Sequence, residues 1–218
     1  MLFRSFPDAL KGAEWTGNPV RSEIAAIALP AVRYAARQGP LRVLIVGGSL
    51  GSQALNEAVP RALGLMSAGE RPEVVHQAGE THLAALNDNY RNAGVHGELL
   101  AFIDDMARRY AAADLVICRA GATTIAELSA AGMASVLVPF PHAVDDHQSA
   151  NARFLADRGA AILLPQERLT PAGLAGLLRA LDRRALLAMA EKARLLGKPD
   201  AARIVADRCV ALAEGGAA

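Results

Sequence analysis

The chain is poor in aromatic residues, cysteine and lysine, and it contains no long apolar run. Aromatic residues make up 4% of its 218 positions, lysine occurs only at positions 11, 192 and 198, and the cysteines are Cys118 and Cys209. Two cysteines are too few for a disulfide framework, and the apolar strand pattern around Cys118 favours a buried free thiol. No apolar run approaches the roughly 18 residues that cross a bilayer, which excludes a helical membrane span.

A strong charge of either sign and a targeting segment are also lacking. The formal net charge is +1, so there is no electrostatic case for nucleic acid as the main partner. The first residues, Met1–Pro7, lack the long apolar core of a signal peptide. With 52% hydrophobic and 21% charged residues, the composition suits one globular α/β domain or two very small ones, and we expect a cytoplasmic location.

Short apolar runs alternate with segments of helical periodicity. Strands are predicted at Arg42–Val46, Glu73–His76, Glu98–Ala101, Leu115–Cys118, Ser135–Val138 and Ala161–Leu164. Helices are predicted at about Leu55–Met66, Glu80–Ala93, Asp104–Ala112, Thr123–Ala131, His147–Asp157, Pro171–Leu181, Arg183–Leu196 and Ala201–Ala213. This alternation predicts an α/β fold, a Rossmann-like parallel sheet with helices on both faces, whose continuous apolar strands fit burial on both sides.

Glycine and proline mark the ends of several elements. Gly132 and Gly159 stand at helix C-cap positions, and Pro60 predicts a kink or a broken turn within the first helix. The segment Lys11–Pro40 has several glycines and prolines and little periodicity. We therefore predict that residues 1–40 are a linker and that residues 41–218 form the compact domain.

The first predicted strand ends in a glycine-rich loop, Gly47-Gly48-Ser49-Leu50-Gly51, and a helix follows at once. Glycines let a backbone approach a ligand, and the N–H groups that open a helix favour a phosphate. A tight turn needed only for steric reasons explains the same loop equally well. A second such loop, Arg119-Ala120-Gly121, follows the fourth strand. The glycine spacing fits neither a dinucleotide fingerprint nor a P-loop.

Several polar residues after the strands allow two interpretations each. Glu127 completes a Thr-x-x-Glu capping box with Thr124, or it is a carboxylate that accepts hydrogen bonds from a sugar diol. Phe102 is a core residue or a ring that stacks on a ligand, and Arg21 is by default a solvated arginine. A metal site is disfavoured because the spacing of four loop residues matches no standard ligand pattern: these are His142, Asp145, Asp146 and His147.

Six segments, taken together and in order, resemble one family. They are G-N-P-V-R at 17–21, G-G-S-L-G at 47–51, H-Q-A-G at 76–79, F-I-D-D-M at 102–106, C-R-A-G-A-T-T-I-A-E-L at 118–128 and P-F-P-H-A-V-D-D-H-Q-S-A-N-A at 139–152. They resemble the C-terminal half of the MurG family, whose members transfer N-acetylglucosamine from UDP-N-acetylglucosamine to the undecaprenyl-pyrophosphoryl-muramyl-pentapeptide in peptidoglycan synthesis (lipid I to lipid II). The resemblance implies a GT-B glycosyltransferase, with two Rossmann-like domains and an active site between them.

The resemblance also implies which residues bind UDP-N-acetylglucosamine, and it implies no metal and no cofactor. The ligand residues would be Arg21 and Ser49 near phosphate, Phe102, Ile103 and Met106 around the uracil, Thr124 at the diphosphate, Glu127 at the ribose hydroxyls and Gln148 at the sugar hydroxyls. Gly47, Gly48, Gly51 and Gly121 would form the phosphate loops. His147 stands where some members have a second glutamine, which leaves a further sugar contact open.

The family's N-terminal half carries the proposed general base, the acceptor site and the main membrane-contacting patch, and none of these has a counterpart in the 218 residues. We therefore expect residues 1–40 to be an interdomain linker, and residues 41–218 to be a UDP-sugar-binding domain that does not transfer sugar by itself. The full enzyme would be peripheral to the inner face of the cell membrane. Two alternatives remain: half of another GT-B enzyme such as a UDP-sugar 2-epimerase, or a non-catalytic nucleotide-sugar-binding module.

Overall fold

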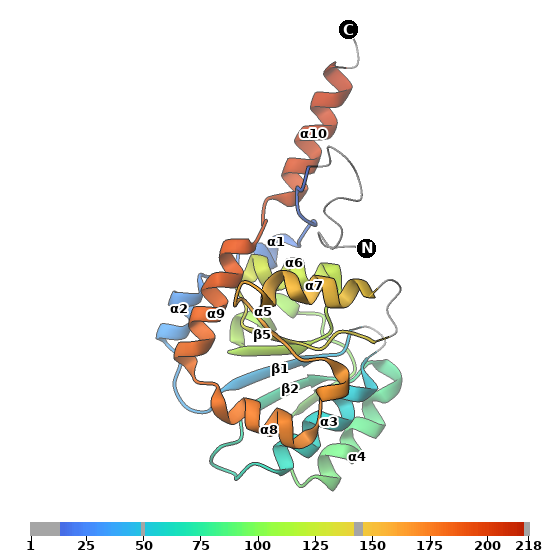
Figure 1. The fold of residues 1–218 in the computed structure, drawn as a ribbon, viewed down its shortest axis with the longest axis vertical. Coiled ribbons are helices and arrows are strands. Elements are labelled where there is room, and N and C mark those ends of the chain that lie inside the picture. Colours follow the sequence, from blue (N-terminus) through green and yellow to red (C-terminus); the bar gives the residue numbers. More distant parts are fainter. Residues whose placement is uncertain (1–13, 49–50, 142–145, 216–218) are drawn as a thin grey trace.

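Six parallel strands form the sheet at the centre of the structure, a computed structural model that describes residues 14–48, 51–141 and 146–215 (Figure 1). The strands are β1 (Arg42–Val46), β2 (Glu73–Gln77), β3 (Glu98–Leu100), β4 (Leu115–Cys118), β5 (Ser135–Leu137) and β6 (Ile162–Leu163). Every predicted strand is confirmed, and each strand ends within one residue of its prediction.

Helices connect the strands and continue after them. They are α1 (Ser22–Ala25), α2 (Pro30–Ala35), α3 (Gln53–Gly64), α4 (Leu83–Asn92), α5 (Met106–Ala112), α6 (Ala122–Ala131), α7 (His147–Ala156), α8 (Pro171–Ala180), α9 (Arg183–Leu196) and α10 (Ala201–Gly215), with short 3₁₀ helices η1 (Glu80–His82) and η3 (Gln166–Arg168). The eight predicted helices are confirmed, and the segment predicted as Glu80–Ala93 consists of η1 followed by α4. Gly132, at φ +62°, is the C-cap residue of α6, as predicted.

The strand order in the sheet is β3-β2-β1-β4-β5-β6, and all neighbouring strands are parallel. From β1 the chain moves outward through β2 to β3, and it then returns to β4 and moves outward in the other direction. The order therefore reverses between β1 and β4, where Val43 pairs with Leu115 and Val46 with Cys118. Open α/β sheets bind ligands beyond the carboxyl ends of the strands at such a point.

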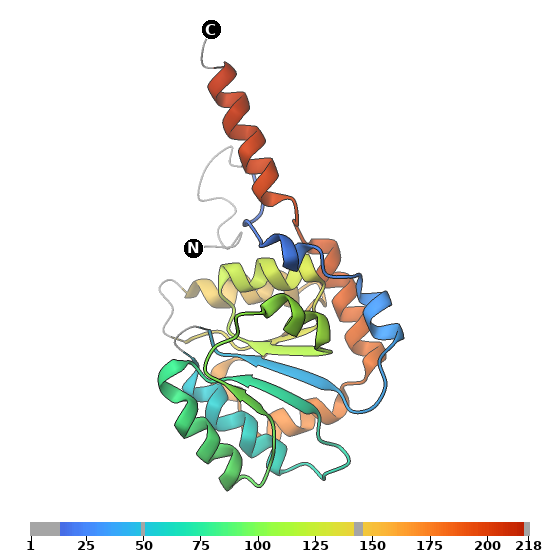
Figure 2. The ribbon, with the colours of Figure 1, turned by 180° about the vertical axis from the view of Figure 1, so that it is seen from behind.

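Helices cover both faces of the sheet (Figures 1 and 2), and alternate side chains of each strand pack against them on opposite faces. In β1, Leu44 and Val46 belong to a cluster with α1, α5, α6 and α7, whereas Val43 and Ile45 belong to a cluster with α3, α4, α8 and α9. All residues of β4 and β5 are buried. The predicted arrangement, a doubly covered parallel sheet, is therefore confirmed, and α3 and α6 leave the sheet toward opposite faces.

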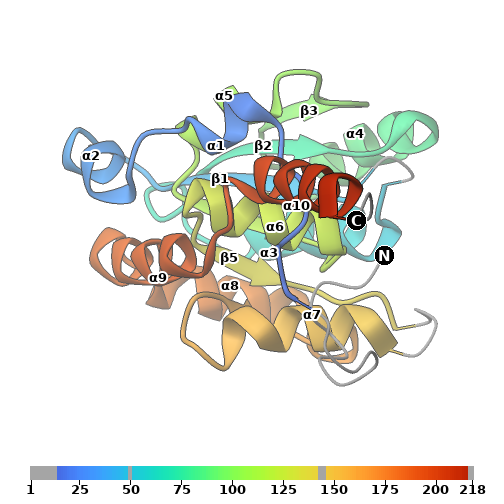
Figure 3. The ribbon, with the colours of Figure 1, turned by 90° about the horizontal axis from the view of Figure 1, so that it is seen from above.

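Residues 22–35 pack on this domain, although the sequence places them in a linker. Ile24 of α1 is fully buried, and α2 lies beside α9 (Figure 3). Arg33 of α2 is buried and donates to the carbonyl oxygens of Ala131 and Gly132, which end α6, and burial lowers its pKa to about 10. The boundary at residue 41 stays a prediction, but the core includes side chains from before it.

Helix α3 continues without a break through Pro60. Proline has no N–H group, so the carbonyl oxygen of Asn56, four residues earlier, loses its usual helical partner. The side-chain amide of Asn89 in α4 donates to that oxygen at 3.0 Å. The predicted broken turn is therefore wrong, because a neighbouring helix supplies the missing donor.

Helix α10 extends away from the sheet beyond the other helices (Figures 1 and 2). Its side chains Val205, Val210 and Leu212 are exposed, and Arg208 forms an ion pair of 2.9 Å with Glu14. Within the described ranges, no helix is both long enough and apolar enough to cross a bilayer. Most of α10 therefore lies outside the core that supports the sheet.

Candidate functional site

A cavity of about 720 Å³ opens beyond the ends of β1 and β4, where the strand order reverses. Its walls are the glycine loop after β1, the start of α3, the loop after β4 with the start of α6, and residues from three later segments, Phe140, Gln148 and Gln166. Six predicted ligand residues line it: Gly47, Gly48, Gly51, Gly121, Thr124 and Gln148. The structure thus brings together two glycine-bearing loops that follow different strands.

The glycines of the loop after β1 differ in their surroundings. Gly51 has a φ of +75°, and a Cβ atom there would lie 2.0 Å from the carbonyl oxygen of Ala78. Gly48 has a φ of +88°, and in the described part of the chain no atom beyond Gly48 and its two neighbours lies within 4 Å of its Cβ position. The positive φ favours glycine at both positions, and a backbone clash further excludes a side chain at Gly51, whereas the Cβ position of Gly48 is open and Gly48 lines the cavity. Ser49, the predicted phosphate contact, lies outside the described residues.

The two helices that leave these loops differ at their N-termini. In α3, the buried Ser52 is the N-cap residue, and its Oγ accepts a hydrogen bond from the N–H of Leu55 at 3.5 Å. In α6, the N-cap residue is Gly121, and no described side chain caps the helix. Uncapped N–H groups carry partial positive charge and attract anions. The N-terminus of α6 is therefore the stronger candidate for holding a phosphate.

Glu127 is not part of a capping box. The box would place Thr124 at the N-cap position, but α6 begins earlier, after Gly121. The Glu127 carboxylate instead accepts a hydrogen bond from Arg21 Nη2 to Oε1 at 3.3 Å, and one from the hydroxyl of Tyr110 to Oε2 at 3.3 Å. The capping interpretation is wrong for this reason. The side chain of Arg21 is half exposed, as expected of a solvated arginine, but it is also paired with Glu127.

The three predicted uracil-binding residues lie after β3: Phe102 and Ile103 precede α5, and Met106 is its first residue. Phe102 is 50% exposed, so the local expectation of a core residue is wrong for its ring. Ile103 is buried, and Met106 packs against the same cluster of buried side chains. These residues do not line the cavity described above, and neither do Arg21 and Glu127. The predicted ligand residues thus form two groups, one around the cavity and one next to α5, where Glu127 accepts a hydrogen bond from Tyr110.

Gln148, in the first turn of α7, is oriented by backbone groups. Its Oε1 accepts hydrogen bonds from the N–H of Ala120 at 3.3 Å and from the N–H of Phe140 at 3.0 Å. Because both partners are donors, the oxygen faces them, and the NH₂ group is left to donate elsewhere. Gln148 therefore holds the loops after β4 and β5 together and can offer a donor to a ligand.

Arg119 lines the cavity, although the sequence assigned it no role. Its guanidinium donates to the carbonyl oxygens of Val138 and Pro139 and, at 2.7 Å, to Oε1 of Gln166. It also lies 5.4 Å from the centre of the Phe140 ring. Burial lowers the pKa of Arg119. In the sequence, Arg119 stands two residues before Gly121, and this position could have indicated a role at the cavity. Gln166, in η3, also lines the cavity but has no such neighbour in the sequence.

The four residues considered for a metal site are only partly described. His142 and Asp145 lie outside the described residues, and Asp146 and His147 stand at the start of α7. Within the described ranges, no three His, Cys, Asp or Glu side chains gather in a way that could hold a metal ion.

Comparison with known sequences identifies relatives over nearly the whole chain. The model of the glycosyltransferase family 28 C-terminal domain matches residues 42–205. Relatives named UDP-N-acetylglucosamine--N-acetylmuramyl-(pentapeptide) pyrophosphoryl-undecaprenol N-acetylglucosamine transferase include one from Aromatoleum aromaticum, 61% identical over 96% of this chain and 59% of its own length. One from Nitrosospira multiformis is 61% identical over 94% of this chain and 58% of its own length. The chain thus spans about 59% of the length of these curated relatives.

Solved structures show the same fold. The crystal structure of MurG from Acinetobacter baumannii is 41% identical, with a TM-score of 0.83, over 93% of this chain and 57% of that one. Glycosyltransferase VinC in complex with dTDP is 20% identical, with a TM-score of 0.52, over 84% of this chain and 41% of that one, and this shows the fold alone. The predicted fold class, a Rossmann-like half of a GT-B glycosyltransferase, is therefore confirmed.

Proposed function

The chain belongs to glycosyltransferase family 28, whose C-terminal domain it contains, and from this we propose that it binds UDP-N-acetylglucosamine as the donor in a transfer of N-acetylglucosamine. The acceptor would be the undecaprenyl-pyrophosphoryl-muramyl-pentapeptide that the relatives' names describe. The observation that carries the proposal is the uncapped N-terminus of α6, which meets the bare backbone of Gly48 in one cavity.

The diphosphate would lie between the N-terminus of α6 and the loop that contains Gly48. When the bond from the sugar to the β-phosphate oxygen breaks, negative charge develops on the departing UDP. Helix N–H groups that already point at this position stabilise that charge without rearrangement. Thr124 and the guanidinium of Arg119 line the same cavity and would add a hydroxyl and a positive charge.

The uridine would extend from the diphosphate toward the group around α5. There the backbone of Ile103 would pair with the uracil edge, with Phe102 and Met106 beside it, and Glu127 would accept hydrogen bonds from the ribose hydroxyls. Arg21 forms an ion pair with Glu127 in the structure. A contact between Arg21 and phosphate would therefore require its guanidinium to move away from that carboxylate.

The acceptor site and a general base would lie in the part of the relatives that this chain does not cover, and the 218 residues alone would then bind donor without turnover. The main membrane contact would lie in that same part, so that the whole protein is peripheral to the inner face of the cell membrane. Radiolabelled sugar transfer to a lipid acceptor analogue tests this division. Turnover by the 218 residues near the rate of the full-length protein would contradict it.

Calorimetric titration tests the donor assignment. UDP and UDP-N-acetylglucosamine should bind, and ADP and GDP should bind much more weakly, because a site that pairs with a uracil edge leaves polar groups unpaired against a purine. Each such buried group costs about 1–3 kcal/mol. Equal affinities for the three nucleoside diphosphates would overturn the proposal.

Two other functions were compatible with the sequence. Half of a UDP-sugar 2-epimerase would share the sheet, but the relatives at 61% identity are named as transferases. A module that only binds a nucleotide sugar would have the same cavity, and it would also bind UDP in the titration. Transfer activity of the full-length protein separates this last alternative from the donor domain.

A further inference from the structure

We propose that Tyr110 is a positioning residue that holds the carboxylate of Glu127 in the orientation that accepts the two ribose hydroxyls of a nucleotide. This inference rests on the proposed function, because that function assigns the ribose to Glu127. Neither the motifs of the sequence nor the relatives' names assign a role to Tyr110. The inference starts from the hydrogen bond between its hydroxyl and Oε2 of Glu127.

The hydrogen bond joins the interior of the domain to the candidate ribose ligand. Tyr110 lies in α5, is 1% exposed and belongs to the buried cluster that includes Ile125 and Leu128 of α6. Its hydroxyl is 3.3 Å from Oε2 of Glu127, whose side chain is 13% exposed. The buried ring fixes the place of the hydroxyl, and the hydroxyl therefore approaches the carboxylate from the protein side.

The hydroxyl of Tyr110 acts as the donor. Burial, with the neighbouring Glu127, raises its pKa well above the ordinary value, so the phenol stays protonated. Burial likewise raises the pKa of the nearby Cys118 thiol to about 12. A protonated phenol can interact favourably with a carboxylate only by donating its proton. The lone pair of Oε2 that faces Tyr110 is therefore already hydrogen-bonded before any ligand arrives.

The other carboxylate oxygen, Oε1, accepts its hydrogen bond from an exposed donor. Oε1 accepts from Arg21, whose side chain is 49% exposed and belongs to the segment before α1. A solvated arginine can leave when a ribose arrives, whereas a buried tyrosine stays. Tyr110 would therefore keep the carboxylate oriented during the exchange, with its remaining lone pairs turned outward to the diol. Ordering a flexible side chain in advance removes part of the entropic cost of binding.

The decisive variant is Tyr110→Phe, which removes one hydroxyl and keeps the buried ring. Calorimetry with UDP should show an affinity about three- to tenfold weaker than that of the unaltered protein. The affinity for 2′,3′-dideoxy-UDP, which has no ribose diol, should be the same for Tyr110→Phe and the unaltered protein. This second titration also reports whether the site of the variant is folded. A double variant, Tyr110→Phe with Glu127→Ala, should bind UDP as weakly as Glu127→Ala alone.

Tyr90→Phe is the matched control. Tyr90 is also a buried tyrosine whose hydroxyl contacts a side chain, but that side chain is His76, on the opposite face of the sheet. Its UDP affinity should match that of the unaltered protein. Unchanged UDP affinity in Tyr110→Phe, or equal losses for UDP and dideoxy-UDP, would overturn the proposal. If Glu127→Ala also bound UDP normally, the ribose assignment of the proposed function would fail instead.

Discussion

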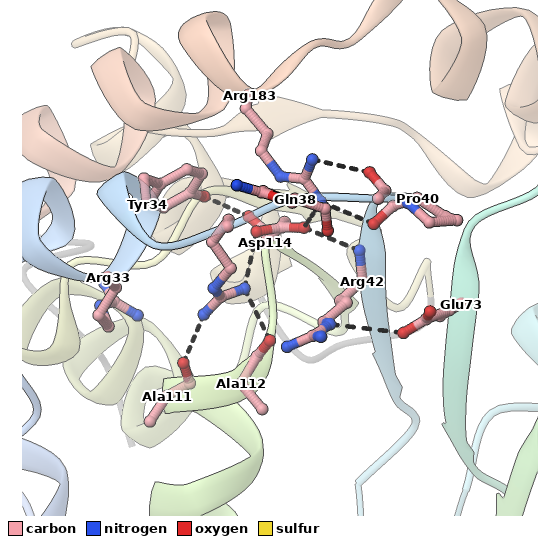
Figure 4. A network of polar contacts seen from close by, with 12 residues as sticks. Arg33, Tyr34, Gln38, Pro40, Arg42, Glu73, Ala111, Ala112, Asp114 and Arg183 are labelled. Atoms are coloured by element: carbon pink, nitrogen blue, oxygen red, sulfur yellow. Dashed lines mark hydrogen bonds and ion pairs between the residues drawn. The ribbon is translucent and has the colours of Figure 1, made fainter.

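The side chains of Arg37 and Asp114 form an ion pair of 2.7 Å in which both partners are almost completely shielded from solvent, at 8% and 0% exposure. Asp114 also accepts hydrogen bonds from the side chain of Arg183 and from the backbone N–H of Arg42 (Figure 4). One carboxylate therefore joins the segment before β1, the start of β1, the start of β4 and the start of α9. This buried group ties residues before the predicted domain boundary to the sheet.

Replacing this carboxylate should destabilise the protein strongly. Asp114→Ala leaves two buried or half-buried guanidinium groups without their acceptor, and removing one partner of a buried pair costs about 3–5 kcal/mol. Urea unfolding followed by circular dichroism measures the change. Asp88→Ala is the control, because the pair of Asp88 with Arg91 is exposed and contributes about 0–1 kcal/mol. Similar losses for the two variants would contradict a structural role for Asp114.

Glu127→Ala should weaken UDP binding by roughly tenfold to a few hundredfold, because hydrogen bonds to a charged group contribute about 1.5–3 kcal/mol each. Its melting temperature should fall by only a few degrees: Glu127 does not cap α6, but the buried hydroxyl of Tyr110 loses its acceptor, which costs about 1–3 kcal/mol. 2′-Deoxy-UDP should bind the unaltered protein more weakly than UDP does, yet bind the variant almost as UDP does. The control is Glu73→Ala. Glu73 is an exposed partner of Arg42 that does not line the cavity, so this variant should bind UDP with unchanged affinity. Normal UDP binding by folded Glu127→Ala would remove this residue from the site.

Gln148→Glu distinguishes the role of the amide oxygen of Gln148 from the role of its NH₂ group. A carboxylate still accepts from the N–H groups of Ala120 and Phe140, so the free energy of unfolding should be retained. It cannot donate, however, so the contact with a sugar hydroxyl oxygen is lost. The added negative charge repels the diphosphate of both ligands, so we expect both to bind more weakly and UDP-N-acetylglucosamine to lose about tenfold more affinity than UDP, as measured by calorimetry. Equal losses of affinity for UDP and UDP-N-acetylglucosamine would show that the NH₂ group does not contact the sugar.

A buried histidine makes the stability of the fold depend on pH. The Oδ1 of Asn56 lies 3.0 Å from Nε2 of His76, and the amide of Asn56 donates to the carbonyl oxygen of Ala78. This arrangement assigns the proton to Nε2, so that Nδ1 accepts from the hydroxyl of Tyr90. Burial lowers the pKa of His76 to about 3, and the neutral ring is the folded form.

Because the folded-state pKa of His76 lies below its unfolded value near 6.5, its contribution to stability is complete above pH 6.5 and is lost as the pH falls toward 3. Urea unfolding of the unaltered protein and of His76→Gln, each at pH 7.5, 5.5 and 4.5, measures this. Below pH 5.5 the free-energy difference between the two proteins should fall by about 1.4 kcal/mol per pH unit. A difference that stays constant from pH 7.5 to 4.5 would mean that His76 charges freely in the folded state.

Local sequence patterns predicted the elements of the fold, but not all of their interruptions. The apolar runs of β1 and β4 are visible without any partner, and both strands have the predicted bounds. The broken turn considered at Pro60 does not form, because Asn89 of the next helix donates to the carbonyl oxygen that Pro60 leaves without a helical partner. The periodicity of α3 contains no information about that donor, since the contact depends on how two helices pack.

The sequence by itself determined the alternation of strands and helices, and hence that two glycine-bearing loops lie at the same edge of a parallel sheet. Periodicity and glycine placement are local properties, so they can be recognised without knowing which segments pack against each other. Only the tertiary structure decided that Arg21 and Tyr110 meet at Glu127, across 106 and 17 positions of the chain. It also left the N-terminus of α6 uncapped while Ser52 caps α3. Such relationships depend on which helix crosses which strand, and that is decided when the two faces of the sheet are packed.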